Sequence, residues 1–214
     1  TFTNKAATEM KKRVSVLLGN QRFNSYTSPL FWLGTFHAIC LKILKSNSLE
    51  AGLDPNFLIY DTDEQLDVVK SVLKKMDLNN KEIKPKGILS NISNAKNELL
   101  TPTEYDKYAQ GFLQEIVAKV YHQYQKKLDE NNALDFDDLI MKTVKLFEEN
   151  PQILEKFQTL FKYILIDEYQ DTNAVQYRLA EQLCAAHNNL CVVGGDDQSI
   201  YDWRGAEIKN ILQF

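Results

Sequence analysis

Two adjacent carboxylates, Asp167 and Glu168, are the side chains of this sequence best placed to do chemistry. They follow residues 161–166, an apolar run rich in β-branched and aromatic residues that predicts a buried strand. Ligands of open α/β sheets bind beyond the carboxyl ends of the strands, where these two acids would lie. One acid can face a hydrated Mg²⁺, and the other can orient or deprotonate a water that attacks a phosphoryl group. The alternative is that Asp167 and Asp171 only cap the helix that follows.

Other stretches of the chain favour the chemical role. They are TFTNKAATEM at residues 1–10, GTFH at residues 34–37 and VVGGDDQSIYDWRGA at residues 192–206. Together with DEYQD at residues 167–171, and in this order, they closely resemble superfamily 1 DNA helicases of the UvrD/Rep/PcrA type. The resemblance covers the whole chain. Two of its motifs, DEYQD at residues 167–171 and DQSIY at residues 197–201, are together far more specific than a single glycine pattern.

The resemblance implies an ATP-dependent 3′–5′ DNA helicase or translocase, which couples ATP hydrolysis to movement on single-stranded DNA in repair or replication. Asp167 would hold Mg²⁺, and Glu168 would activate the attacking water. Gln170 and Gln198 would sense the γ-phosphate of ATP. Gln198 and Arg204 would bind the nucleotide, although Arg204 could instead fix its own loop.

The resemblance also implies a set of DNA contacts. Aromatic rings can stack on any base, and hydroxyl or imidazole groups can bind phosphate oxygens without reading the sequence. The matching residues are Phe2, Asn4, Thr35, His37, Phe136, Tyr201 and Trp203. For Phe2, Phe136 and Trp203 a place in the core is the alternative, and a lone histidine such as His37 is more often structural.

One position departs from the family pattern. The family usually has Asp directly after the first glycine of the motif at residues 192–206, and here that position is Gly195. The change removes a carboxylate near the nucleotide and loosens the backbone. Either the site is weakened, or the neighbouring Asp196 substitutes for the missing acid.

The composition, with 44% hydrophobic and 25% charged residues, is that of an ordinary globular protein. Nothing approaches a membrane-spanning run, so we expect a cytoplasmic protein with no membrane partner. Residues 1–45 hold seven Lys or Arg and one Glu, residues 46–150 hold 13 basic and 19 acidic residues, and residues 151–214 hold five and nine. This asymmetry suggests a basic face on an acidic body, although a solvated lysine-rich helix explains part of it.

The elements that must position these residues are of two kinds. Short strands are predicted at residues 30–33, 161–166 and 190–193. From about residue 46 to residue 134 the pattern is helical, with capping-box signals such as Thr101-Pro102-Thr103-Glu104 and no β-rich run. We therefore expect an α/β fold, with a partial RecA-like parallel sheet flanked by helices and an inserted all-helical subdomain. Its motor domain would comprise residues 1–45 and 135–214, and the insert would comprise residues 46–134.

Apolar residues at helical spacing predict the buried faces of the helices. They are Ala6, Ala7, Met10, Val14, Leu17 and Leu18 in the first helix, Leu66, Val69, Leu73 and Met76 in another, and Phe112, Ile116, Val120 and Tyr124 in the longest. Asp135 and Asn150 are expected to cap helices, and Asp137 and Asp138 suit the dipole of a helix start. The cysteines, Cys40, Cys184 and Cys191, have apolar surroundings and are expected to be buried free thiols.

The phosphate-loop pattern Gly-x-x-x-x-Gly-Lys-Ser/Thr does not occur in the 214 residues. Because the family places this loop upstream, we expect an internal piece of a longer protein, lacking its first strand and phosphate loop and inactive alone as an ATPase. The implied partners are single-stranded DNA and its junctions with duplex DNA, a second motor domain of the same parent chain, and possible repair or replication proteins. The alternatives are a non-catalytic nucleic-acid-binding module of the same fold, or the motor part of a helicase–nuclease recombination complex.

Overall fold

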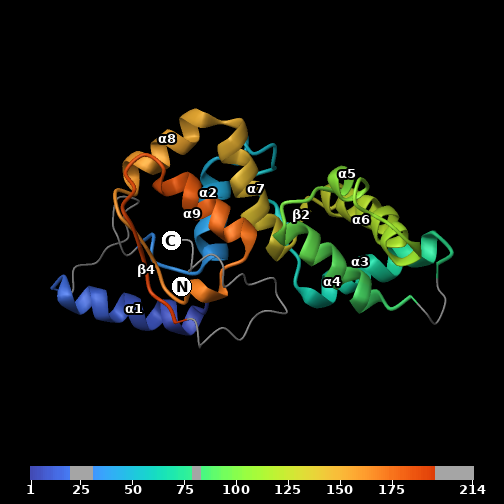
Figure 1. Ribbon diagram of the computed structural model, residues 1–214, viewed down its shortest axis with the longest axis horizontal. Coiled ribbons are helices and arrows are strands. Elements are labelled where there is room, and N and C mark those ends of the chain that lie inside the picture. Colours follow the sequence, from blue (N-terminus) through green and yellow to red (C-terminus); the bar gives the residue numbers. More distant parts are fainter. Residues whose placement is uncertain (20–30, 79–82, 196–214) are drawn as a thin grey trace.

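The computed structural model describes residues 1–19, 31–78 and 83–195, and its helices and strands form two groups along the longest axis (Figure 1). The first group holds α1 (Asn4–Leu17), α2 (Phe36–Ser46), α7 (Phe136–Glu149), α8 (Pro151–Leu160), α9 (Ala174–Cys184), β3 (Ile164–Ile166) and β4 (Leu190–Val192). The second group holds α3 (Thr62–Lys75), α4 (Pro85–Asn97), α5 (Pro102–Tyr105) and α6 (Phe112–Glu130). The combination of helices with short parallel strands confirms the predicted α/β class.

Strands β3 and β4 run parallel, with Ile166 opposite Val192. The pairing continues beyond both strand ends, because Val193 N donates to Ile166 O at 2.8 Å and Tyr169 N donates to Val193 O at 2.9 Å. The segment that follows β3 is therefore fixed against the segment that follows β4.

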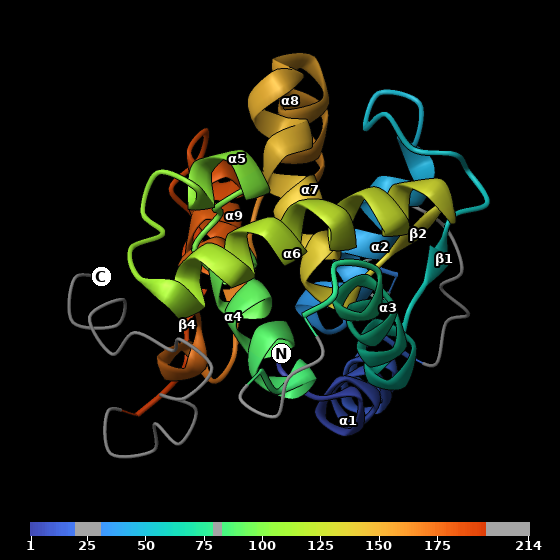
Figure 2. The same cartoon turned by 90° about the vertical axis from the view of Figure 1, so that its right-hand side faces the viewer.

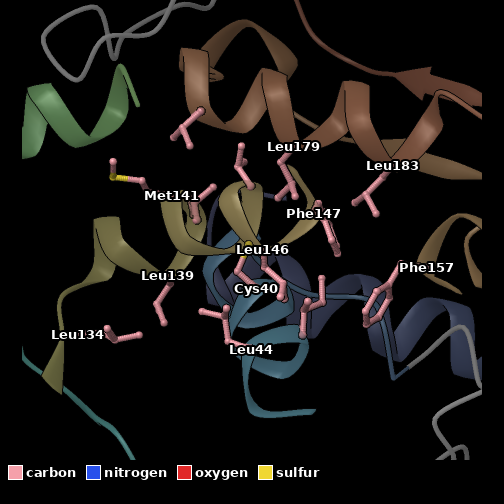
Figure 3. Packing of buried hydrophobic residues seen from close by; sticks show 14 of the residues in the cluster. Cys40, Leu44, Leu134, Leu139, Met141, Leu146, Phe147, Phe157, Leu179 and Leu183 are labelled. Carbon is pink, nitrogen blue, oxygen red and sulfur yellow. The ribbon is translucent and has the colours of Figure 1, made fainter. Parts of the chain in front are cut away.

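The core of the first group lies between α2, α7 and α9, with a ring from α8 at its edge (Figure 3). Cys40 and Leu44 of α2 meet Phe147 of α7 and Leu183 of α9, and Phe157 of α8 is fully buried beside them. Burying a side chain of this size contributes roughly 1.5–3 kcal/mol. Since α7 lies in the middle of this cluster, its position is firmly set, and so is the place of its N-terminus.

The second group has a core of its own, to which α3, α4 and α6 contribute. Figure 2 shows this group from its outer end, with α6 packed on both α3 and α4. Val69 of α3, Ile92 of α4 and Val117 of α6 are completely buried there. The capping box predicted at residues 101–104 is confirmed. A second box has Asp61 accepting from Glu64 N at 2.9 Å.

A short parallel strand pair lies where the chain passes into and out of the second group. Strand β1 (Leu58–Ile59) pairs with β2 (Ala133–Leu134), and Tyr60 N donates to Leu134 O at 2.8 Å. The sequence predicts no strand here, because two residues are too few to show an alternating pattern. The pairing holds the outgoing and returning segments together.

The strand predicted at residues 30–33 is wrong in its described part, since residues 31 and 32 form a turn and residue 33 belongs to no strand. Trp32 packs edge-on against Phe161 and Phe157, with ring centroids 4.9 and 5.7 Å apart. Aromatic residues favour strands mainly through packing, and packing onto α8 buries this one without a strand. The strand predicted at residues 161–166 is also shorter, because only its last three residues pair.

Several predictions of burial are wrong. Leu17 is 83% exposed and Phe112 is 69% exposed, because each lies at the end of its helix, beyond the turns that contact neighbouring elements. Cys40 is buried as predicted, whereas Cys184 is half-buried and Cys191 is exposed. Among the described residues, no helix is both long and apolar enough to cross a membrane.

The cap predicted at Asn150 is wrong in its detail. Asn150 occupies the N-cap position of α8, with Pro151 next to it, but its side chain makes no cap hydrogen bond there. The amide instead donates to Leu146 O, at the end of α7, at 3.1 Å. Asn150 therefore begins α8 through its backbone carbonyl, which accepts from Leu154 N, while its side chain closes α7.

Candidate functional site

Five of the seven predicted DNA-contact residues line one cavity of about 280 Å³. They are Phe2, Asn4, Thr35, His37 and Phe136, and the remaining wall is apolar, formed by Ala38, Leu41, Ile59 and Leu139. These residues come from three places far apart in the sequence. The structure thus brings together residues that the family resemblance selected separately.

Three helix N-termini meet at this cavity, and each has a side-chain cap. Thr3 Oγ1 accepts from Ala6 N at the start of α1 (3.1 Å), and Thr35 Oγ1 accepts from Ala38 N at the start of α2 (3.3 Å). Asp135 Oδ1 accepts from Asp138 N at the start of α7, at 2.8 Å. Helix N-termini carry partial positive charge and favour anions. The starts of α1 and α2 have no acid in their first turns and suit a phosphate backbone, whereas the first turn of α7 holds Asp137 and Asp138.

Two aromatic contacts set the rings of the cavity. Phe2 packs edge-on against Phe36, with centroids 6.0 Å apart, and His37 packs edge-on against Phe136 at 5.9 Å. Phe136 remains 45% exposed, so the alternative that it only fills the core is wrong. Its free ring surface can stack on a base.

Several basic residues lie on α1 and α2, two of the helices whose starts line the cavity. Lys5, Lys11 and Lys12 of α1 are exposed. Burial and the nearby Lys11 lower the pKa of Lys42 on α2. Part of the positive charge of residues 1–45 therefore lies on helices that begin at the cavity.

The predicted catalytic acids directly follow β3. Asp167 is half-buried and Glu168 is exposed. Glu168 has left-handed backbone angles, φ 55° and ψ 42°, which a non-glycine residue adopts at some energetic cost. The helix that follows, α9, is capped by Asn173, which accepts from Gln176 N at 3.0 Å. The alternative that Asp167 only caps this helix is therefore wrong.

Gln170 connects the two strand ends. Its side chain is fully buried; Nε2 donates to Glu168 Oε2 at 2.8 Å, and Oε1 accepts from Gly195 N at 3.2 Å. A Cβ on Gly194 would lie 2.3 Å from Gln170 Oε1, so any larger residue at that position would displace the Gln170 side chain. Gln170 thereby orients the carboxylate of Glu168 with respect to β4.

A divalent cation fits this edge by its ligand chemistry. Mg²⁺ in phosphoryl-transfer sites takes one or two carboxylates, and its other ligands are waters and phosphate oxygens. Asp167 supplies such a carboxylate at the carboxyl end of a parallel strand, where ligands of α/β sheets bind. In the described ranges, no group of three or more His, Cys, Asp and Glu residues could hold a metal by itself.

The other predicted site residues, Gln198, Tyr201, Trp203 and Arg204, lie outside the described residues, as does Asp196. The two possibilities for the missing family acid at Gly195 therefore both stand. The structure shows that the backbone N–H of Gly195 donates a hydrogen bond to Gln170 Oε1.

Sequence reasoning missed a buried charge cluster beside the cavity. Lys96 of α4 is fully buried, and its Nζ lies 2.7 Å from Asp135 Oδ2 and 2.8 Å from Asp138 Oδ1. Tyr124 OH donates to Asp135 Oδ2 at 2.9 Å. One signal was present, because Lys96 continues the every-fourth-residue apolar stripe of α4 that includes Ile92. A lysine on such a stripe must be buried with a partner.

The pKa values in this cluster follow from burial and mutual attraction. Burial alone lowers the pKa of Lys96, but Asp135 and Asp138 outweigh it and raise this pKa. Burial and the neighbouring Asp138 raise the pKa of Asp135 to about 6. Burial also acts to raise the pKa of Asp138, but Lys96 and Lys142 reverse the effect and lower it. The cluster is held as a cation between two carboxylates.

Comparison with known proteins gives one consistent result. A family model described as the UvrD/REP helicase N-terminal domain matches residues 1–214. Over all 214 residues the chain is 51% identical to the ATP-dependent DNA helicase PcrA of Bacillus subtilis (strain 168). It is 49% identical to the proteins of the same name from Staphylococcus aureus (strain Mu50 / ATCC 700699) and Staphylococcus epidermidis. The match covers 100% of this chain and 28% of the length of each of these relatives.

Proposed function

Because the chain belongs to the UvrD/REP helicase family, whose N-terminal domain model matches all 214 residues, we propose that it works within the first motor domain of an ATP-dependent DNA helicase. The observation that carries the proposal is the cavity at three helix N-termini, which gathers five polar or aromatic residues suited to a single strand. The activity would be 3′–5′ movement on single-stranded DNA, up to and through its junctions with duplex DNA, in repair or replication.

In this proposal the cavity grips the strand without reading its sequence. Phe2 and Phe136 would stack on bases, while Asn4, Thr35 and His37 would contact the phosphate backbone. The exposed lysines of α1 would add a salt-dependent attraction. Tyr201 and Trp203 would complete the stacking surface.

The carboxylates after β3 would form the nucleotide side, with ATP and Mg²⁺ as the ligands. A Mg²⁺ ion held at this edge would supply positive charge that stabilises the negative charge developing on the phosphates. Asp167 would hold the ion, and Glu168, oriented by Gln170, would accept a proton from the attacking water. Gln198 and Arg204 would contact the phosphates from the segment after β4.

The domain division is part of the proposal. Residues 1–45 and 135–214 would form the motor domain, and residues 46–134 would form an inserted helical subdomain beside duplex DNA. The hydrophobic cluster that α3, α4 and α6 share is separate from those of the first group and supports this division, while Phe57 and Leu134, near its boundaries, pack with the first group. A second motor domain of the complete protein would close over the nucleotide, and repair or replication proteins would be further partners. A cytoplasmic location is also proposed, since helicase work requires access to DNA.

The test compares two exposed phenylalanines. Binding of fluorescein-labelled oligo-dT is measured by anisotropy for the wild type, Phe136→Ala and Phe112→Ala, at several salt concentrations. Because loss of one stacked base costs about 1–3 kcal/mol, Phe136→Ala should weaken binding by roughly 5- to 150-fold. Phe112, 69% exposed at the start of α6, is outside the cavity, and its variant should bind within about 2-fold of the wild type.

Equal affinities for the two variants would contradict the proposal for the cavity. The catalytic part is tested separately on the complete protein, as ATP hydrolysis in the presence of oligo-dT. Binding that depends on Phe136 without any hydrolysis would favour the second candidate, a non-catalytic nucleic-acid-binding module. The observation in favour of that candidate is Gly195 in place of the family Asp.

A further inference from the structure

Helix α4 holds two buried acids at the start of α7. Lys96 binds Asp135 and Asp138 through its Nζ, at 2.7 and 2.8 Å. Burial raises the pKa of the third acid, Asp137, and Ser93 and Asn97 of α4 act against this rise. The contacts on α7 lie in one helical turn, so α4 fixes the direction of that turn.

The first turn of α7 also carries Phe136, and this ring is directed differently from its neighbours. Asp135 and Asp138 are buried against α4 and α6, whereas Phe136 is exposed and lines the cavity beside His37. Any shift of α4 that moved the three acids would therefore move the ring as well. Buried charges resist such shifts, because an unpaired buried charge is costly.

Asn97 also reaches the nucleotide side. Its Oδ1 accepts from Asn173 Nδ2 at 2.8 Å, a contact between residues 76 positions apart. Asn173 caps α9 immediately after the turn at residues 169–171, in which Gln170 holds Glu168. Helix α4 is thus connected through Lys96 to the turn that carries the stacking ring, and through the next residue, Asn97, to the turn that carries the catalytic base.

We propose that Lys96 and Asn97 are positioning residues that couple DNA binding to ATP hydrolysis through helix α4. The inference rests on the proposed function. Lys96 holds the start of α7, which carries the DNA-side ring, and Asn97 transmits a displacement of α4 to the start of α9. This connection is separate from the segment after β4, and it gives the helical group a role in the coupling between the two sites.

The Asn97–Asn173 hydrogen bond can be removed while the cap of α9 is kept. Asn173→Asp keeps the carbonyl-type oxygen that caps α9 but removes the amide that donates to Asn97. Asn97→Ala removes the same contact from the other side. Asn94→Ala is the matched control, because Asn94 is an exposed asparagine on the same helix.

ATP hydrolysis by the complete protein is measured over a range of oligo-dT concentrations, together with thermal melting. Both single variants should lower the DNA-stimulated kcat by about 3- to 10-fold. The oligo-dT concentration that gives half-maximal stimulation should stay within about 2-fold, because Phe136 remains in place. The double variant should be no slower than the slower single variant, because both remove one contact. Asn94→Ala should match the wild type.

Unchanged DNA-stimulated kcat in both single variants would overturn the inference. So would multiplicative losses in the double variant, or a loss that only accompanies a lower melting temperature, since these indicate independent or merely structural roles. If the wild type shows no DNA-stimulated hydrolysis at all, the proposed function itself fails, and this inference fails with it.

Discussion

The cavity lined by Phe2 and Phe136 and the turn that carries Glu168 are supported in opposite ways. The cavity rests on three capped helices and on a buried charge cluster, which joins α7 to α4 over 39 residues of sequence. The turn follows a strand of three residues, has a left-handed backbone at Glu168, and is joined to the segment after β4 by the backbone of Tyr169 and the side chain of Gln170. Changes that weaken the support of the cavity should therefore cost stability, whereas changes in the turn should cost activity first.

Glu168→Gln in the complete protein is expected to have the largest effect on activity. Loss of a positioned general base typically lowers the rate about 10²- to 10⁴-fold, so DNA-stimulated ATP hydrolysis should fall by that amount. Stability should change little, because Glu168 is exposed and a glutamine oxygen can still accept from Gln170. The measurements are steady-state hydrolysis and urea unfolding.

Glu155→Gln is the control for this variant, because Glu155 is an exposed acid on α8. It should leave both hydrolysis and unfolding at wild-type values. Retained hydrolysis in Glu168→Gln, or a comparable loss in the control, would remove the assignment of Glu168 as the base. A large loss of stability would instead contradict the contrast between the turn and the cavity.

Lys96→Met should have the largest effect on stability. Removing the cation leaves Asp135 and Asp138 buried together without compensation, which costs about 3–5 kcal/mol of the free energy of unfolding. Lys70→Met is the matched control, because the Lys70–Asp67 pair is on the surface and should contribute no more than about 0.5 kcal/mol. Urea unfolding of both variants measures the difference directly.

The pH dependence of Lys96→Met tests the cause of this loss. Burial and Asp138 already raise the pKa of Asp135 to about 6, and removal of the lysine should raise it further. In the unfolded chain an Asp has a pKa of about 3.9, so the native variant binds a proton that the unfolded chain has lost. Its stability should therefore fall as the pH rises from about 4 through the raised pKa. The deficit relative to the wild type should be larger at pH 8 than at pH 5, and an equal deficit would exclude carboxylate repulsion as its cause.

Local features of the fold were predictable from the sequence, and distant contacts were not. The capping box at residues 101–104 depends on neighbours in sequence and was correct. The pairing of β1 with β2 brings together residues about 75 positions apart, and two-residue strands leave no periodic pattern. Trp32 illustrates the opposite error, since its type favours a strand but packing against α8 decides its conformation.

The candidate site shows the same division. The family motifs selected Phe2, His37 and Phe136, and these residues line one cavity. Lys96 lies outside those motifs, and its partners, 39 or more residues away, cannot be identified from spacing. Its place on an apolar stripe was the one available signal, and it predicts burial without naming the partner.

Gly194→Ala should have the smallest effect, and it tests how tightly the turn is held. The added Cβ would lie 2.3 Å from Gln170 Oε1 and 3.2 Å from Tyr169 N, so the side chain of Gln170 cannot relieve the clash by moving alone. A clash of this kind costs about 1–3 kcal/mol. Because Gly195 N donates to Gln170, the amide hydrogen of Gly195 should exchange faster in the variant.

Gly87→Ala is the control, because Gly87 is at a helix position with no atom within 4 Å of the added Cβ. In this control the Gly195 amide should exchange as it does in the wild type. Unchanged exchange at Gly195 in Gly194→Ala would mean that Gln170 does not hold the strand ends together, and Glu168 would then need a different support.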